Sequence, residues 1–93
     1  MIVGVCVIDL KLYESLSLKD KRRIIKSTLH KIKNKNNVSI SEVENQDKWQ
    51  LATLGLSTVS TDKVQANKVI NSIMKFLENQ SDFEVIDLQI EFL

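Results

Sequence analysis

The chain has no proline and only two glycines, Gly4 and Gly55, among its 93 residues. Proline and glycine are common in linkers, disordered segments and tight turns. Their scarcity argues against all three, and against an all-β fold with many turns. No apolar run approaches the roughly 20 residues that a membrane-spanning helix needs. The length is that of one domain with a single modest core.

Cysteine and histidine occur once each, as Cys6 and His30. A single cysteine cannot form an internal disulfide, and inside an apolar run we expect a buried thiol that behaves as a small hydrophobe. The two residues lie too far apart for a zinc motif or a Cys–His pair, so no metal site and no cofactor are predicted. The opening "MIVGVCVIDL" lacks a basic leader and a cleavage site, which indicates a strand. We therefore expect a cytoplasmic bacterial protein with no membrane partner.

The first part of the chain predicts a strand followed by a helix. Residues 2–12 are rich in Val and Ile without a helical period, which is typical of a strand. The following "SLSLKD" favours a helix start, because Ser17 can cap the first turn and Asp20 can return the bond. The helix is expected to run to about Lys33. The "NKNN" at 34–37 should end it, since Asn tolerates the left-handed conformation of helix exits.

A hairpin is predicted next, from strands at 38–44 and 49–60 joined by a short turn at 45–47. The apolar positions of its first strand slip from even to odd numbers between Ile40 and Val43. One inserted residue would produce such a slip, so we expect a β-bulge there.

The last part of the chain predicts a second helix and a final strand. The helix, capped by Ser60 or Thr61, should run to about Glu78, because its apolar residues fall in one arc. The strand at 83–93 alternates between apolar and polar residues. One of its faces is expected to carry Ile86, Leu88, Ile90 and Phe92.

The resulting order is β-α-β-β-α-β. It predicts an α+β, ferredoxin-like sandwich, with a four-stranded antiparallel sheet in the order 4-1-3-2 and two helices on one face. The core is expected to contain Ile25, Leu29, Ile32, Val69, Ile73, Leu77, Ile86, Leu88 and Ile90. Val3, Val5 and Val7 share one face of the first strand. If that face is the open one it needs covering, and we expect a homodimer.

Charge is strongly segregated along the sequence. Residues 19–35 carry eight Lys or Arg and one acid, a net charge of +7, whereas the remaining chain carries five cations and eleven acids, a net charge of −6. An exposed helix usually mixes both signs, because like charges four residues apart are destabilising. A stripe of cations suits phosphates and predicts binding to structured RNA through counterion release. The alternative is a solvated face that only maintains solubility. The stripe comprises Lys19, Arg22, Arg23, Lys26, His30 and Lys33.

Lys21 lies within the apolar arc of the same helix, beside Ile25. The favoured interpretation is that its stem covers the core while its ammonium reaches the rim. A buried ion pair with an acid from a neighbouring strand is the alternative. Three carboxylates around the hairpin, those of Glu42, Glu44 and Asp47, are suited to a hard cation. The hairpin lacks a glycine-bearing calcium loop, so no metal site is predicted there.

Trp49 is the single tryptophan and stands at the start of a predicted strand. It is interpreted as a packing anchor rather than a base-stacking platform, since one aromatic residue alone is weak support for single-strand binding. Gly4 and Gly55 both lie inside predicted strands, so the chain has no glycine-rich phosphate loop.

The stretches "SLKDKRRIIKS" and "NVSISEVENQDKWQLATLG", with "VS" before the second helix, resemble the YlxP-like family of small bacterial proteins, a domain of unknown function. The resemblance covers nearly the whole chain, and the linked pair "SLKDKR" and "EVENQDKWQ" is its specific part. It implies a ferredoxin-like fold. Because members are often encoded beside translation-initiation and ribosome-maturation genes, it also implies a role near the ribosome. The family has no established catalytic residue. The matched positions are Ser17, Lys19, Asp20, Lys21, Arg22, Arg23, Glu42, Asp47 and Trp49.

Three classes of function remain open, because a fold alone does not decide between them. The favoured one is a non-catalytic RNA- or ribosome-associated module that uses the basic helix. The second is a protein-interaction or oligomerisation module that uses the open sheet face. The third is a small phosphate-ester or acyl-phosphate hydrolase, since acylphosphatases share this element order. The stretch "LYESLSL" after the first strand has no glycine-rich cradle and no arginine before Arg22, which counts against an enzyme.

Overall fold

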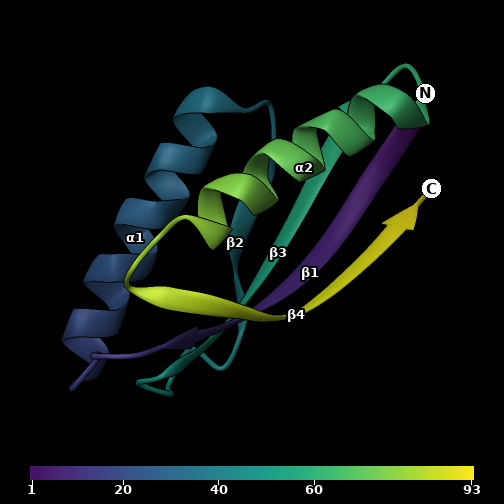
Figure 1. The fold of residues 1–93 in the computed structure, drawn as a ribbon. Helices are drawn as coiled ribbons and strands as arrows, with labels where there is room; N and C mark the ends of the chain where they lie inside the picture. Colours follow the sequence, from purple (N-terminus) through teal and green to yellow (C-terminus); the bar gives the residue numbers. More distant parts are fainter.

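A computed structural model describes residues 1–93. Its four strands form one antiparallel sheet in the order β2-β3-β1-β4. This is the predicted ferredoxin-like arrangement (Figure 1). The elements are β1 (Ile2–Leu12), α1 (Leu18–Lys35), β2 (Ser39–Glu44), β3 (Leu51–Ser60), α2 (Lys63–Glu78) and β4 (Phe83–Phe92).

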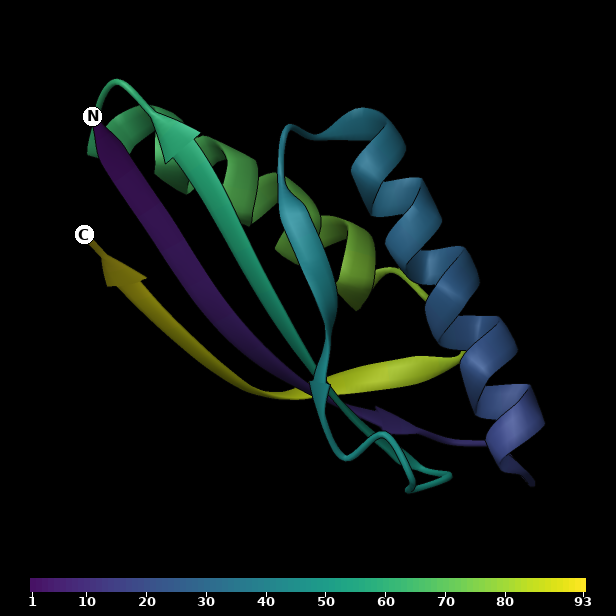
Figure 2. The ribbon, with the colours of Figure 1, turned by 180° about the vertical axis from the view of Figure 1, so that it is seen from behind.

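The two helices occupy different places over the sheet. In Figure 1, α2 crosses the strands β1 and β3, whereas α1 lies beside the edge strand β2. The view from behind in Figure 2 shows that no helix covers the opposite face of the sheet. Neither helix is both long and apolar enough to cross a membrane. The chain ends lie together, where Val3 and Leu93 exchange backbone hydrogen bonds of 2.8 and 3.0 Å.

The central strand β1 sorts its side chains by the two-residue period of a strand. Its even-numbered residues from Cys6 to Leu12 are fully buried beneath the helices. Val3, Val5 and Val7 share one face, as the sequence predicts; it is the uncovered face, and Val7 is exposed. The buried thiol predicted for Cys6 is confirmed.

The predicted N-terminal cap of α1 is confirmed, whereas the C-terminal end of the helix differs from the prediction. Ser17 precedes the helix, and its hydroxyl accepts a 3.1 Å hydrogen bond from the backbone N–H of Asp20. The helix continues to Lys35 and ends at Asn36, whose backbone is extended, with φ of −135°. The left-handed exit is therefore wrong. Asn36 instead donates from its side chain to the carbonyl of Ile32 at 3.0 Å, which satisfies a helix-end acceptor.

The start of α2 differs from the prediction as well. Neither Ser60 nor Thr61 is the cap, because Ser60 still belongs to β3 and Asp62 precedes the helix. The carboxylate of Asp62 accepts a 2.9 Å hydrogen bond from the N–H of Gln65. A carboxylate at this place satisfies an orphan donor and favours the positive end of the helix.

Six of the nine predicted core residues are confirmed, and the three from β4 are wrong. Ile25, Ile32, Ile73 and Leu77 are buried, and Leu29 and Val69 pack against them partly buried. The three members from β4 are exposed instead, by 50% for Ile86, 37% for Leu88 and 42% for Ile90.

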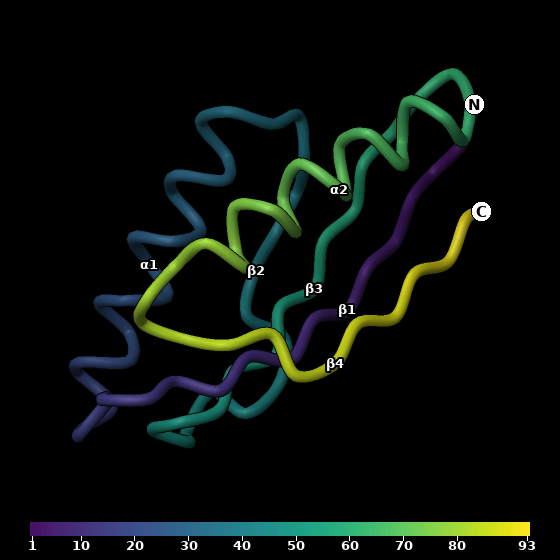
Figure 3. The backbone as a smooth tube through the Cα atoms, in the orientation of Figure 1, coloured from purple at the N-terminus to yellow at the C-terminus, as the bar shows by residue number.

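A β-bulge explains the error at Ile86 in β4. Val85 pairs with Leu10 and Asp87 pairs with Asp9, so Ile86 is an extra residue without a partner. One extra residue reverses the phase of the strand, and Val85 rather than Ile86 packs against the core. In Figure 3 the tube of β4 changes direction partway along. Beyond the bulge the strand forms an uncovered edge of the sheet, which leaves its apolar side chains half exposed.

Candidate nucleic-acid interface

The basic stripe of α1 lies on the surface of the molecule. Its six residues, Lys19, Arg22, Arg23, Lys26, His30 and Lys33, are all exposed. Four of them line a shallow groove of about 440 Å³, together with Ile25, Leu29 and Glu42. These four are Arg22, Lys26, His30 and Lys33. Because Glu42 belongs to β2, the groove follows the seam between α1 and the edge of the sheet.

The charge of the stripe is not neutralised within the protein. The structure contains a single ion pair between side chains, and it involves Lys21, which is not part of the stripe. The sole hydrogen bond from a stripe side chain joins His30 to Asn34 at 3.2 Å. The stripe is therefore free to bind anions from outside.

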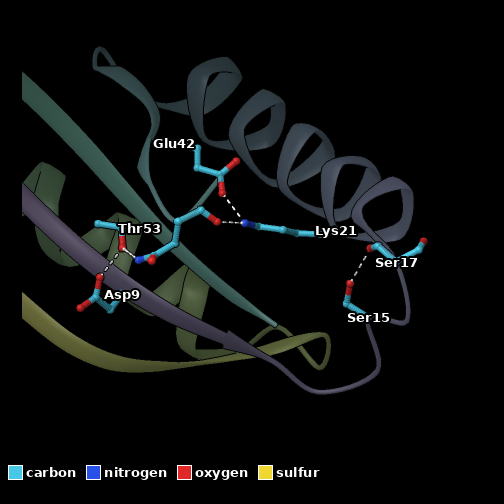
Figure 4. Close-up of polar contacts among 7 residues, drawn as sticks. Asp9, Ser15, Ser17, Lys21, Glu42 and Thr53 are labelled. Carbon is cyan, nitrogen blue, oxygen red and sulfur yellow. Dashed lines mark hydrogen bonds and ion pairs between the residues drawn. The ribbon is translucent and has the colours of Figure 1, made fainter. Parts of the chain in front are cut away.

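Lys21 is the one cation of α1 that is not on the surface, because its side chain is fully buried. Its Nζ lies 2.7 Å from Oε2 of Glu42 and donates a hydrogen bond to the backbone carbonyl of Asn45. Figure 4 shows Lys21 reaching from the helix to Glu42. The favoured interpretation, an ammonium at the rim, is therefore wrong, and the alternative of a buried ion pair is confirmed. Glu42 is 15% exposed and opens onto the groove.

A chain of hydrogen bonds continues from Lys21 into the sheet. Asn45 has a left-handed backbone, with φ of 61°, at the end of β2. Its Nδ2 donates to Oγ1 of Thr53 at 2.8 Å, and that hydroxyl donates to Oδ1 of Asp9 at 2.6 Å. The network of Lys21, Glu42, Asn45, Thr53 and Asp9 thus joins α1, the hairpin and β1. Polar groups buried in this way are stabilised only when they are paired.

A second contact fixes the other end of the hairpin loop. Ser15, buried ahead of α1, donates from its hydroxyl to the carbonyl of Ser17 at 3.1 Å. Its own carbonyl accepts a 3.5 Å hydrogen bond from Nε2 of Gln50. The loop at 45–50 is therefore attached at both ends to the region where α1 begins.

The remaining hairpin candidates do not converge. Glu42 pairs with Lys21, while Glu44 and Asp47 are exposed. Trp49 is 53% exposed in the loop, because β3 begins only at Leu51, so the interpretation as a packing anchor is wrong.

Sequence reasoning missed Asn45, Thr53 and Asp9 as members of the network. A weak signal existed for the first of them. Asn is the non-glycine residue most tolerant of a left-handed backbone, and here it follows a predicted bulge. Thr53 and Asp9 gave no signal, because 44 positions separate them and only the sheet brings them together.

These features define a class of protein. It is a ferredoxin-like sandwich whose first helix carries an unpaired cationic stripe outside and a lysine bound to the hairpin inside. The chain belongs to the family described as Protein of unknown function (DUF503), whose model matches residues 3–90. It is 35% identical over 82 residues to the uncharacterized protein YlxP of Bacillus subtilis (strain 168), covering 88% of this chain and 89% of that protein. The family predicted from the sequence is confirmed.

Solved structures support the fold alone. The de novo designed protein Foldit4 superposes with a TM-score of 0.56 at 16% identity, covering 100% of this chain and 97% of that one. A second de novo design, LFR1 1 with ferredoxin fold, gives 0.50 at 14% identity, covering 100% and 83%. Two designed proteins of this shape have no bearing on biological activity, so the function must be argued from the surface of this chain.

Proposed function

We propose that this protein is a non-catalytic module that binds structured RNA through the basic stripe of α1. The observation that carries the proposal is that none of the six stripe residues has an ionic partner in the protein. In a helix with a net charge of +7 the cationic side chains repel one another, and this repulsion lowers the stability of the helix. A polyanion removes this repulsion on binding.

The shape of the stripe suits a nucleic-acid backbone. Its residues recur at helical spacing along α1, and four of them border one side of the groove beside β2. Lysine and arginine side chains on such a surface contact phosphates, which positions the protein without reading sequence. We therefore expect weak binding with little sequence preference. The neighbourhood of the family's genes makes ribosomal RNA the first RNA to test.

Neither Cys6 nor Ser15, two fully buried residues with a nucleophilic atom, is activated for catalysis, which supports a non-catalytic module. Cys6 is fully buried, and burial raises the pKa of its thiol to about 11, so very little thiolate forms at neutral pH. Ser15 is also fully buried and donates its hydroxyl to a carbonyl, with no base beside it.

The test compares two pairs of charge reversals that change the net charge equally. Arg22→Glu/Arg23→Glu alters the stripe, whereas Lys68→Glu/Lys75→Glu alters exposed lysines of α2. Binding to a blunt RNA hairpin at low salt should be abolished by the first pair and retained by the second. Both variants should melt within a few degrees of the parent, because all four side chains are exposed. Equal loss in both variants would mean that only net charge matters, and no binding by the parent would refute the proposal.

Self-association through the uncovered sheet face is a second candidate, favoured by a separate observation. Val7, Val43 and Val59 are all exposed, and the register places Val7 and Val59 on that face. Val43 lies over Gly55, the partner of Val7, and so belongs to the same patch. A second copy would bury these valines in an isologous dimer. Sedimentation that shows only monomer at high micromolar concentration would exclude this dimer.

A further inference from the structure

Trp49 is an exposed tryptophan held in a defined place. Tryptophan is the largest side chain and is highly buried on average, yet 53% of this one is exposed. It borders a hollow of about 470 Å³ together with Asp47, Lys48, Gln50 and Leu51. Singly exposed apolar residues are common on protein surfaces, so exposure alone does not give Trp49 a function.

The loop that carries Trp49 is attached to α1 and to the segment just before it. At one end the carbonyl of Asn45 accepts from the buried Lys21, and at the other Gln50 donates to the carbonyl of Ser15. Burying a lysine and a glutamate costs desolvation that their attraction does not always recover, so such pairs are weak devices for stability. They do fix geometry. Here the fixed geometry is that of the hairpin loop against the start of α1.

The same attachment brings the indole to the cationic end of the molecule. Both contacts lie at or just before the first turn of α1, which also contains Lys19, and Arg22 and Arg23 follow directly. Figure 2 shows the loop between β2 and β3 at the same end of the molecule as the start of α1. Two sets of groups used by single-strand binders, an aromatic face and the first cations of the stripe, therefore lie at the same end of the molecule.

We infer that Trp49 stacks on one unpaired base of an RNA whose backbone lies along the stripe of α1. The inference rests on the proposed function and adds the site for a single-stranded nucleotide beside a duplex. Asp47 supports a base rather than a phosphate in the hollow, because its carboxylate repels a phosphate and accepts from an amino group on a base edge. Lys48 lines the same hollow, and its ammonium suits the phosphate of the next nucleotide.

The test uses Trp49 as its own reporter, since the chain has no other tryptophan. The probes are one RNA hairpin with a blunt end and the same hairpin with a short single-stranded 3′ extension. The extension should quench the fluorescence and tighten binding at least about fivefold, the lower bound for stacking one base. The blunt hairpin should bind without this quenching.

Variants separate stacking from charge. Trp49→Leu should remove the gain from the extension and leave the affinity for the blunt hairpin unchanged, while Trp49→Phe should keep part of the gain. Tyr13→Leu is the matched control, because Tyr13 is 51% exposed but donates to Glu84 at an acidic site, and this variant should keep the full gain. Melting curves confirm that each variant folds.

Each failure has a distinct form. If both RNAs bind equally and Arg22→Glu/Arg23→Glu abolishes binding, the proposed function stands and the stacking site is refuted. The same holds if Trp49→Leu leaves the gain intact. If Trp49→Leu changes only the sedimentation of the protein, the indole is a protein contact and the inference is wrong. If neither RNA binds at low salt, both the proposed function and the inference are wrong.

Discussion

The two helices lie in the same layer and have similar lengths, but they contribute differently. The buried residues of α2 are all apolar, namely Ala66, Ile70, Ile73, Met74 and Leu77. Those of α1 include a lysine and a threonine beside two isoleucines, namely Lys21, Ile25, Thr28 and Ile32. Within its bounds α2 carries three lysines and one glutamate, whereas α1 carries eight cations and one aspartate. Stability is therefore expected to reside mainly in α2, and binding in α1.

This contrast follows from where each helix lies on the sheet. Because α2 crosses β1 and β3, its inner face meets apolar strand residues along its length (Figure 1). Because α1 lies beside the edge strand β2, it has a shorter apolar contact and a solvent-facing groove. A polar network fills the remaining space beneath α1, and its exposed face keeps an uncompensated charge.

The largest expected effect on stability is in α2. Ile73 is fully buried, so Ile73→Ala should leave a cavity and lower the free energy of unfolding by about 4 kcal/mol. Urea unfolding followed by circular dichroism measures this change. A loss below half a kcal/mol would mean that α2 does not form the main wall of the core.

Lys21 in α1 should give the next largest effect. Lys21→Met keeps the apolar stem but leaves Glu42 as an unpaired carboxylate and the Asn45 carbonyl without its donor. We expect a loss of about 3 kcal/mol, near the low end for breaking a buried pair, because Glu42 borders the groove and can regain some water. The same urea experiment applies, and a loss under 1 kcal/mol would show that the ammonium contributes little.

Removing the partner as well should recover part of that loss. In the background of Lys21→Met, the change Glu42→Gln replaces the stranded charge with a neutral amide. The double variant should be more stable than the single one by at least about 1 kcal/mol. If instead the two losses add, Lys21 and Glu42 are not coupled, and the loop is positioned by other contacts.

The smallest effect concerns Cys6, which belongs to the same core cluster as the buried face of α2. Burial raises the pKa of its thiol from 9.0 to about 11, so the folded state binds its proton more tightly than the unfolded state. This contribution to stability is present below pH 9 and is lost as the pH rises toward 11. Alkylation by iodoacetamide at pH 8 should be far slower in the folded protein than in urea. Equal rates would show that water reaches the core beneath α2.

Local patterns were enough to predict the element order and most of the core. The strand predicted from the run rich in Val and Ile, the two helices predicted from their apolar arcs and the bulge predicted from the slip in β2 are all present in the structure. The pattern misled in β4, where Ile86 is an extra residue that reverses the phase. The sequence does carry a local sign of this bulge, because the apolar positions shift from odd at Phe83 and Val85 to even at Ile86, as they slip in β2.

The candidate site was predictable only in its exposed part. A helical wheel suffices for the stripe, because exposure of Arg22 or Lys26 depends on α1 alone. The partner of Lys21 depends on a contact across 21 positions, made when the bulged strand β2 packs against the helix. The place of Lys21 within the apolar arc did indicate that it is buried. That Glu42 is its partner becomes apparent only when the fold brings β2 against α1.

The salt dependence of RNA binding tests the central claim most directly. If the stripe of α1 neutralises about four phosphates, a plot of log K against log salt for the parent should have a slope near −3 to −4, at roughly 0.7–0.9 per contact. Arg22→Gln should reduce the magnitude of that slope by about one, and Lys68→Gln in α2 should leave it unchanged. This result would assign the contacts to α1. A slope near zero, or one that both variants reduce equally, would contradict the account.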